Sequence, residues 1–213
     1  MRRPQMIFNI HFDYKAYSGS ASSLRPNEMK KAFEKAGYDV VEVEGNWSQR
    51  QSNAKKLMRM IKEGWRPKFL YAESSTTPHQ VGSKWRIPMK SYETKLARLA
   101  SKHGIGTALF YRDVYWKFSQ PKGLKEQLIQ MYYKPFHELE VKLYRKSFDR
   151  IYMPSLAMGN FLSFNEGQVH ALPPGGTQEE ILENLEDGVK FIYVGGITSK
   201  GGMYDLTSVF KKL

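Results

Sequence analysis

The chain of 213 residues carries 33 Lys and Arg against 21 Asp and Glu, a formal net charge of +12. Apolar residues make up 41% and aromatic residues 14%, which favours a packed core and excludes a wholly disordered chain. The absence of Cys excludes disulfides and thiolate metal sites and fits a cytosolic setting, and no run approaches the roughly 18 apolar residues of a membrane span.

The positive charge is unevenly placed along the chain. Residues 1–170 hold 29 basic and 15 acidic side chains, an excess of 14, whereas residues 171–213 hold four basic and six acidic ones. Such a field attracts polyanions, namely nucleic acid, an anionic membrane face or phosphorylated substrates. Charge alone does not choose among these partners.

Short apolar runs alternate with helical patterns as far as residue 172. Apolar residues at helical spacing predict helices over residues 26–37, 54–65, 92–104 and 124–148, with Pro26 at the first helical position and Gly37 and Gly104 as terminators. We expect strands at Met6–Phe12, Val40–Val43, Lys68–Ala72, Ile105–Tyr111, Arg150–Ser155 and Gln168–Leu172. This alternation predicts an α/β fold, a Rossmann-like doubly wound parallel sheet.

The composition changes at Pro173. Two prolines and two glycines at 173–176 interrupt regular structure, and five acidic residues follow without a basic one. We therefore expect a first domain of residues 1–172, a linker at 173–188 and the start of a second domain at 189–213, where a strand, a Gly-rich turn and a helix form one βα unit. We expect this chain to be part of a longer protein.

Polar segments follow the strands at the edge where open α/β sheets bind ligands, the carboxyl ends of the strands. They are residues 18–25, 73–90, 112–117 and 173–176. The first offers Gly19 for close backbone approach, the hydroxyls of Ser18 and Ser20, Arg25, and a helix N-terminus that favours an anion. It matches neither the Walker loop nor the GxGxxG motif, and a polar turn with a helix cap is the alternative.

The segment 73–90 is longer than the connections that compact domains usually use. Its first residues combine acceptors, donors and an imidazole, in Glu73, Ser74, Ser75, Thr76 and His79. A dense set of hydroxyls suits sugar recognition, because each ligand hydroxyl needs a partner. The alternative is a surface loop that these side chains cap and cross-link.

The sequence "YRDVYWKF" (residues 111–118) places an Arg–Asp pair and several aromatic rings directly after a buried strand. Asp113 is the candidate that orients or deprotonates a hydroxyl, Arg112 accompanies it, and Tyr115 and Trp116 offer rings for stacking. A buried ion pair with core aromatics is the alternative. No HExxH, Cys/His, DxD or GxSxG motif is found, so the sequence predicts no metal site and no serine-hydrolase elbow.

Two helical faces are basic. Lys55, Arg59 and Lys62 share one face of their predicted helix, and four more cations, from Lys142 to Arg150, end the long helical region. A solvated face is the usual meaning of such a pattern. Adhesion to an anionic membrane leaflet is the other interpretation that the positive field allows.

Several stretches, taken together, resemble bacterial glycosyltransferases of the capsular-polysaccharide type, which have the GT-B fold and are close to glycosyltransferase family 4. The stretches follow the family's order over nearly the whole chain. The most specific are "YAESSTTPHQVGSKWRIP" and "GIGTALFYRDVYWKF", supported by "SGSASSLRPNEMKKAFEKAGYDVVEVEG", "MPSLAMG", "LPPGG" and "FIYVGGITSKGGMYDL".

The resemblance implies a glycosyltransferase that acts without a metal or cofactor, with a nucleotide-sugar donor and a saccharide or lipid-linked saccharide acceptor. It also implies a role in bacterial surface polysaccharide synthesis in the cytoplasm, including the inner face of the plasma membrane. The Gly19 loop would approach the donor, and residues 73–79 with Arg112 and Asp113 would line the acceptor side. Gly195, Gly196 and Lys200 would meet the donor diphosphate.

The sequence departs from the family in two motifs, and it lacks a third. Many relatives have His-Asp where Arg112 and Asp113 stand, and Gly-Arg where Gly195 and Gly196 stand. The later acidic motif that grips the donor sugar does not occur before Leu213, so this chain alone should hold a donor poorly.

Two other function classes compete with the enzyme. One is a non-catalytic module that binds carbohydrate or membrane and lacks its donor domain. The other is nucleic-acid binding through the positive field, for which the sequence shows no known reader motif. Transfer from a nucleotide-sugar would favour the enzyme, and steeply salt-dependent binding to arbitrary DNA would favour the last class.

Overall fold

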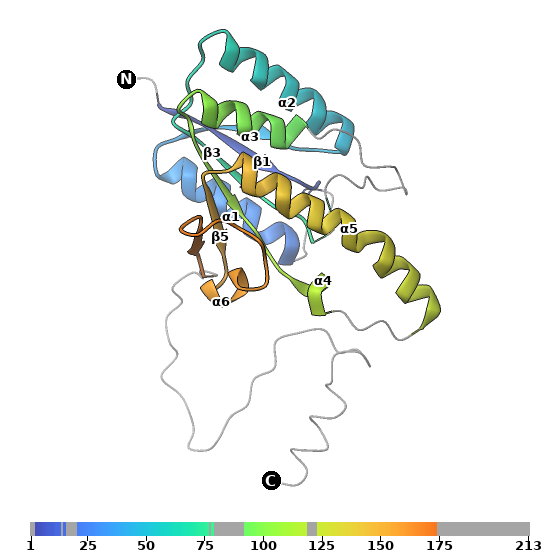
Figure 1. The fold of residues 1–213 in the computed structure, drawn as a ribbon. Helices are drawn as coiled ribbons and strands as arrows, with labels where there is room; N and C mark the ends of the chain where they lie inside the picture. Colours follow the sequence, from blue (N-terminus) through green and yellow to red (C-terminus); the bar gives the residue numbers. More distant parts are fainter. Residues whose placement is uncertain are drawn as a thin grey trace, which may run out of the picture. The chain divides into compact units, whose positions relative to one another are not determined.

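Parallel strands form the centre of the molecule, with helices on both sides (Figure 1). The computed structural model describes residues 3–13, 15, 21–76, 78, 92–118 and 123–173. Within these residues the strands are β1 (Gln5–Ile10), β2 (Asp39–Val43), β3 (Phe69–Glu73), β4 (Gly106–Phe110), β5 (Arg150–Met153) and β6 (Val169–Ala171). The helices are α1 (Ala21–Lys35), α2 (Trp47–Lys62), α3 (Tyr92–Lys102), α4 (Tyr115–Phe118), α5 (Leu124–Ser147) and α6 (Leu156–Gly159).

The strand order in the sheet is β2-β1-β3-β4-β5-β6, and every pair is parallel. The chain moves from β1 to one side to form β2, then crosses β1 and adds the remaining strands on the other side. The direction of winding therefore reverses between β1 and β3, which makes that pair the topological switch point of the sheet. The predicted fold class, a Rossmann-like doubly wound α/β sheet, is confirmed for the described residues.

Alternate residues of the central strands face different helices, as the pleat of a strand requires. Met6, Phe8 and Ile10 of β1 pack into one buried cluster with side chains of α1. Ile7 of β1 packs into a larger cluster with Leu70 of β3 and with side chains of α2, α3 and α5. The sheet is thus covered on both faces, which explains why its strands read as nearly continuous apolar runs.

Two predicted helix terminators are confirmed. Gly37 has a φ of 91° just beyond α1, and the amide of Tyr38 donates to the carbonyl of Phe33. Gly104 has a φ of 73° beyond α3. A positive φ favours glycine because a side chain would crowd the backbone there, so these residues turn the chain toward the next strand.

The predicted start of the first helix is wrong. The helix α1 begins at Ala21, so Pro26 lies inside the helix instead of at its first position. The φ of proline fits a helix, and its missing amide hydrogen costs one hydrogen bond near the N-terminal end.

The short helices α4 and α6 were not expected, because four residues are too few to show a helical period.

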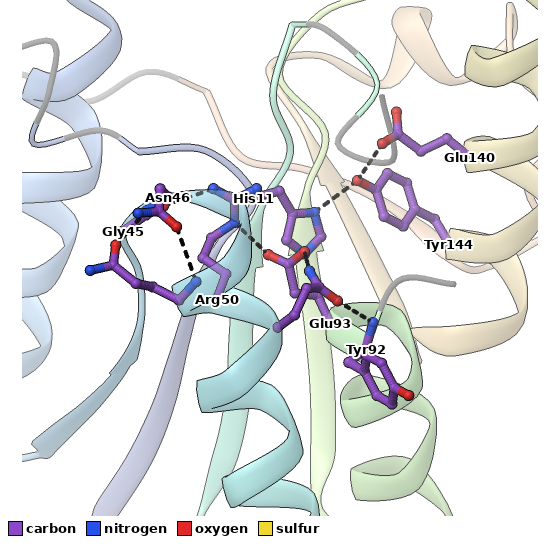
Figure 2. A network of polar contacts seen from close by, with 10 residues as sticks. His11, Gly45, Asn46, Arg50, Tyr92, Glu93, Glu140 and Tyr144 are labelled. Atoms are coloured by element: carbon purple, nitrogen blue, oxygen red, sulfur yellow. Dashed lines mark hydrogen bonds and ion pairs between the residues drawn. The ribbon is translucent and has the colours of Figure 1, made fainter. Parts of the chain in front are cut away.

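A buried ion pair joins α2 to α3 (Figure 2). The Nε of Arg50 donates to Oε1 of Glu93 over 2.9 Å, and the side-chain Nε2 of Gln51 donates to Oε2 of Glu93 over the same distance. Gln51 in turn accepts from the backbone amide of Tyr92, and Arg50 also donates to the carbonyl of Gly45. Both carboxylate oxygens of Glu93 are thereby satisfied, and the N-terminal ends of α2 and α3 are fixed to each other.

The predicted linker at 173–188 and the predicted second-domain unit at 189–213 lie outside the described residues, apart from Pro173. Among the helices of the described residues, none is long and apolar enough to cross a membrane.

Replacing the acid of the buried ion pair is expected to destabilise the domain strongly. Glu93→Ala leaves the Arg50 guanidinium buried without its carboxylate, which should lower the free energy of unfolding by about 3–5 kcal/mol. Urea unfolding followed by circular dichroism measures it. Glu34→Ala removes a carboxylate from a more exposed i,i+4 pair with Lys30 and should cost about 0.5 kcal/mol or less. Equal losses in both variants would contradict the structural role of the buried pair.

Candidate functional site

The candidate site lies at the carboxyl ends of β1, β3 and β4, beside the switch point of the sheet. The backbone pairing continues one residue past these strands. The amide of His11 donates to the carbonyl of Glu73 over 3.1 Å, and the amide of Ser74 donates to the carbonyl of Phe110 over 3.0 Å. The side chains at this edge therefore rest on rigid backbone, as a binding or catalytic arrangement requires.

On the α1 side of the sheet, the buried carboxyl of Glu73 forms an ion pair with the partly exposed Arg25. The Nε of Arg25 lies 3.2 Å from Oε1 of Glu73, whose side chain is fully buried. The hydroxyl of Tyr71 donates to the same oxygen over 3.2 Å, and Nη2 of Arg25 donates to that hydroxyl over 3.3 Å. The guanidinium also lies 3.6 Å from the centre of the Phe110 ring. The position of the Arg25 guanidinium is thus set by contacts with β3 and β4.

The carboxyl of Glu73 holds its proton more readily than an exposed glutamate. Burial raises its pKa above the ordinary value of 4.5, and the positive charges of Arg25 and Arg112 offset that rise only in part. Within the described residues, Oε2 of Glu73 has no hydrogen-bond partner. A carboxyl in this condition can donate to or accept from a ligand hydroxyl, depending on its protonation.

Arg112 and Asp113 lie just beyond the carboxyl end of β4, separated from it by Tyr111. The backbone amide of Arg112 donates to the hydroxyl of Ser74 over 3.1 Å, and its guanidinium lies 5.1 Å from the centre of the Phe12 ring. The carboxylate of Asp113 accepts from the backbone amide of Tyr115 over 3.4 Å at the start of α4. Asp113 therefore faces the first turn of α4, and both residues remain partly accessible.

On the other face of the sheet, three buried side chains form a polar chain (Figure 2). The hydroxyl of Tyr144 donates to Oε1 of Glu140 over 3.0 Å, and Nδ1 of His11 lies 2.8 Å from the same hydroxyl. The His11 and Tyr144 rings are stacked with their centres 5.5 Å apart. The helix α5 supplies the tyrosine and the glutamate, one turn apart, and the histidine is the residue that follows β1.

This geometry assigns the tautomer of His11. Burial raises the pKa of the Tyr144 hydroxyl well above its ordinary value of 10, and the charge of Glu140 adds to the rise, so the phenol keeps its proton. That one proton goes to Glu140, and the phenol oxygen must then accept from Nδ1–H of His11. In a neutral imidazole the lone pair is consequently on Nε2, the nitrogen that can accept a proton.

Trp116 lies against the protein interior. Its ring is stacked on that of His137 with centres 4.9 Å apart, and its Nε1 donates to the Tyr111 hydroxyl over 3.1 Å. Burial lowers the pKa of His137 below its ordinary value of 6.5, although the charges of Glu140 and Asp113 oppose this. The stack therefore holds a neutral imidazole and fixes α4 to α5.

The structure brings part of the predicted site together. At the ends of β3 and β4, Arg25 contacts Glu73 and Ser74 contacts Arg112, whereas Asp113 contacts only the first turn of α4 among the described residues of the predicted site. Ser75 is half-buried, and Thr76 and Tyr115 are exposed. Ser18, Gly19, Ser20, His79, Gly195, Gly196 and Lys200 lie outside the described residues. Their roles stay predictions.

Sequence reasoning missed His11, Asn9, Glu140 and Tyr144. Asn9 lies two residues before His11 in β1, and its fully buried amide has no hydrogen-bond partner in the described part of the chain. Two signals were present in the sequence. An asparagine and a histidine interrupt an apolar strand, and Glu140 and Tyr144 share one helix face at i,i+4 spacing.

No protein-family model matches the chain, and no curated protein matches its sequence. Among the described residues there is no group of three or more His, Asp or Glu side chains that could hold a metal ion.

The raised pKa of Glu73 predicts how stability depends on pH. Between pH 4.5 and its higher folded-state pKa, the unfolded chain releases this proton first, which favours unfolding as the pH rises. The free energy of unfolding of the wild type should therefore fall relative to that of Glu73→Gln as the pH increases from 4 to 8. Urea titrations of both proteins across this range measure the difference. A difference that grows in favour of the wild type would mean that the Arg25 pair dominates over burial.

Removing the hydroxyl of Tyr144 should lower the free energy of unfolding and remove the preference of His11 for the Nδ1–H tautomer. Tyr144→Phe leaves Glu140 and Nδ1–H of His11 buried without their shared partner, which should cost about 1–3 kcal/mol. Urea unfolding measures the loss, and imidazole ¹⁵N chemical shifts report the tautomer. Tyr133→Phe, a half-buried tyrosine on the same helix, is the matched control and should change neither. Wild-type ¹⁵N shifts typical of an Nε2–H tautomer would contradict the assignment.

Proposed function

We propose that this chain is part of a GT-B-type glycosyltransferase that moves a sugar from a nucleotide-sugar to a hydroxyl of a saccharide or lipid-linked saccharide. The observation that carries the proposal is that Arg25 contacts Glu73, and Ser74 contacts Arg112, at the carboxyl ends of β3 and β4 near the β1–β3 switch point, with Asp113 next in the chain. Ligands of open α/β sheets bind at that edge. The site combines cations, carboxyls and a hydroxyl, which suits a ligand with hydroxyls and phosphate.

Glycosyl transfer requires three contributions from the side chains of the site. The bond between the sugar and the diphosphate breaks, so the leaving diphosphate gains negative charge that cations stabilise. The acceptor hydroxyl must be oriented toward the sugar carbon, and its proton must leave. We assign charge stabilisation to Arg112, and orientation of the acceptor hydroxyl and acceptance of its proton to Asp113. Glu73 would hydrogen-bond a sugar hydroxyl.

The sequence supports the proposal independently of the geometry. The stretches "YAESSTTPHQVGSKWRIP" and "GIGTALFYRDVYWKF", which resemble glycosyltransferase family 4, supply Glu73, Ser74, Arg112 and Asp113. Within these stretches, Ser74 contacts Phe110 and Arg112 at the sheet edge. Under the same proposal, Gly195, Gly196 and Lys200 would bind the donor phosphates.

The direct test incubates the 213-residue chain with radiolabelled UDP- and GDP-sugars and polyprenyl-linked saccharide acceptors. Acceptor binding with slow transfer of label and release of nucleoside diphosphate is the expected result, because the sequence predicts that this chain alone holds a donor poorly. Acceptor binding without transfer, measured by saturation-transfer NMR, would instead support a non-catalytic carbohydrate-binding module. Neither binding nor transfer across the panel would contradict the proposal.

Asp113→Asn separates the proposed role from helix capping. Asparagine also caps helices well, so α4 should keep its start while the negative charge is lost. We expect kcat to fall by about 10²-fold or more with little change in stability. Asp39→Asn is the matched control, because Asp39 begins β2 at the opposite edge of the sheet and accepts from Gln5. Equal turnover in the wild type and Asp113→Asn would refute the role of Asp113.

A further inference from the structure

The helix α5 carries apolar side chains on the side that faces away from the core. Leu124, Leu128 and Met131 are 73%, 58% and 72% exposed, and Leu139 continues the row at 41%. Residues three, four and seven positions apart lie on one face of a helix, so these four side chains form one stripe, here named the outer face of α5.

The outer face is separate from the face that packs on the domain. The buried residues of α5 are His137, Glu140, Val141, Tyr144 and Ser147, and they lie roughly opposite the stripe around the helix axis. In Figure 1 the amino-terminal half of α5 extends away from the sheet. The apolar residues of the outer face therefore contribute nothing to the core clusters of the domain.

Neighbouring side chains on α5 add basic character. Lys125, Lys134 and Lys142 are exposed along α5. An apolar stripe flanked by lysines is the pattern of helices that lie in the plane of an anionic membrane surface.

We propose that the outer face of α5 docks on an anionic lipid surface. Charge decides between this partner and a second copy of the chain. Each copy has a net charge of +12, so pairing two copies through a lysine-flanked face would bring like charges together, whereas acidic lipid headgroups neutralise them. The apolar side chains would enter the headgroup boundary while the lysines meet the headgroups.

The proposal places the contact on α5, whose carboxyl-terminal part carries the second basic face expected from the sequence, and not on α2, which carries the first. Lys55, Arg59 and Lys62 are exposed on α2, yet within the described residues none of the exposed large apolar side chains belongs to α2. Attraction at α2 would be electrostatic alone and fully screened by salt. At α5, burial of apolar surface adds a component that salt does not remove. The proposal does not depend on the proposed glycosyltransferase activity.

Vesicle flotation with the 213-residue chain tests the docking. The chain should float with vesicles of phosphatidylcholine and phosphatidylglycerol at 3:1 and much less with phosphatidylcholine alone. Leu128→Glu/Met131→Glu should lower the partition coefficient on the order of tenfold or more, because two exposed apolar side chains can no longer enter the lipid. Leu24→Glu, on α1 at 61% exposure, is the matched control and should bind like the wild type.

A second pair of variants separates the two helices. Lys125→Gln/Lys134→Gln should weaken binding to the anionic vesicles more than Lys56→Gln/Lys62→Gln, which removes two exposed charges from α2. Leu128→Gln/Met131→Gln provides a milder change should the glutamate variant fail to fold, as judged by circular dichroism.

Three results would overturn the proposal. Wild-type chain that does not float with anionic vesicles is the first, and outer-face variants that bind like the wild type are the second. The third is a dimer in sedimentation velocity that Leu128→Glu/Met131→Glu dissociates, which would assign the outer face to a second copy. A transfer assay plays no part in these measurements, so an inactive chain that floats would refute only the proposed function.

Discussion

The pairing of β1 with β3 is the constraint on which the candidate site depends. These two strands are distant in sequence, and their register places Ile7 beside Leu70 and Ile10 beside Glu73. The same ladder continues to His11, whose amide donates to Glu73. Because side chains alternate between the two faces of a strand, a slip of one residue would exchange the apolar and polar positions of this edge. The apolar core on both sides of the sheet excludes that slip, so burial of the core also fixes the polar groups.

Burying polar groups at this edge costs desolvation free energy, which different contacts offset for Glu73 and for His11. Glu73 retains an ion pair with Arg25, a hydrogen bond from Tyr71 and a raised pKa. His11 has the phenol of Tyr144, which is itself satisfied by Glu140. The amide of Asn9 has no hydrogen-bond partner in the described residues. Desolvated groups of this kind cluster at functional sites, since a ligand can supply what the protein does not.

The helix α5 connects the candidate site to the outer face. Its carboxyl-terminal half packs Val141 and Tyr144 into the core and presents Glu140 beside the site, while its amino-terminal half carries the exposed outer face. A lipid-linked acceptor would unite the two proposals, because its carrier would lie in the membrane that α5 contacts. The physical basis is one helix with apolar side chains on two sides, of which the domain buries only one.

The sequence by itself determined the alternation of strands and helices, the ends of α1 and α3 at Gly37 and Gly104, and the gathering of polar residues after the strands. These features follow from periodicity and backbone sterics, which are local. Only the tertiary structure decided that Arg25 pairs with Glu73, that Glu140 and Tyr144 meet His11, and which side of α5 stays exposed. Those contacts join residues up to 133 positions apart, and no local pattern encodes which distant side chain will fill a given buried position.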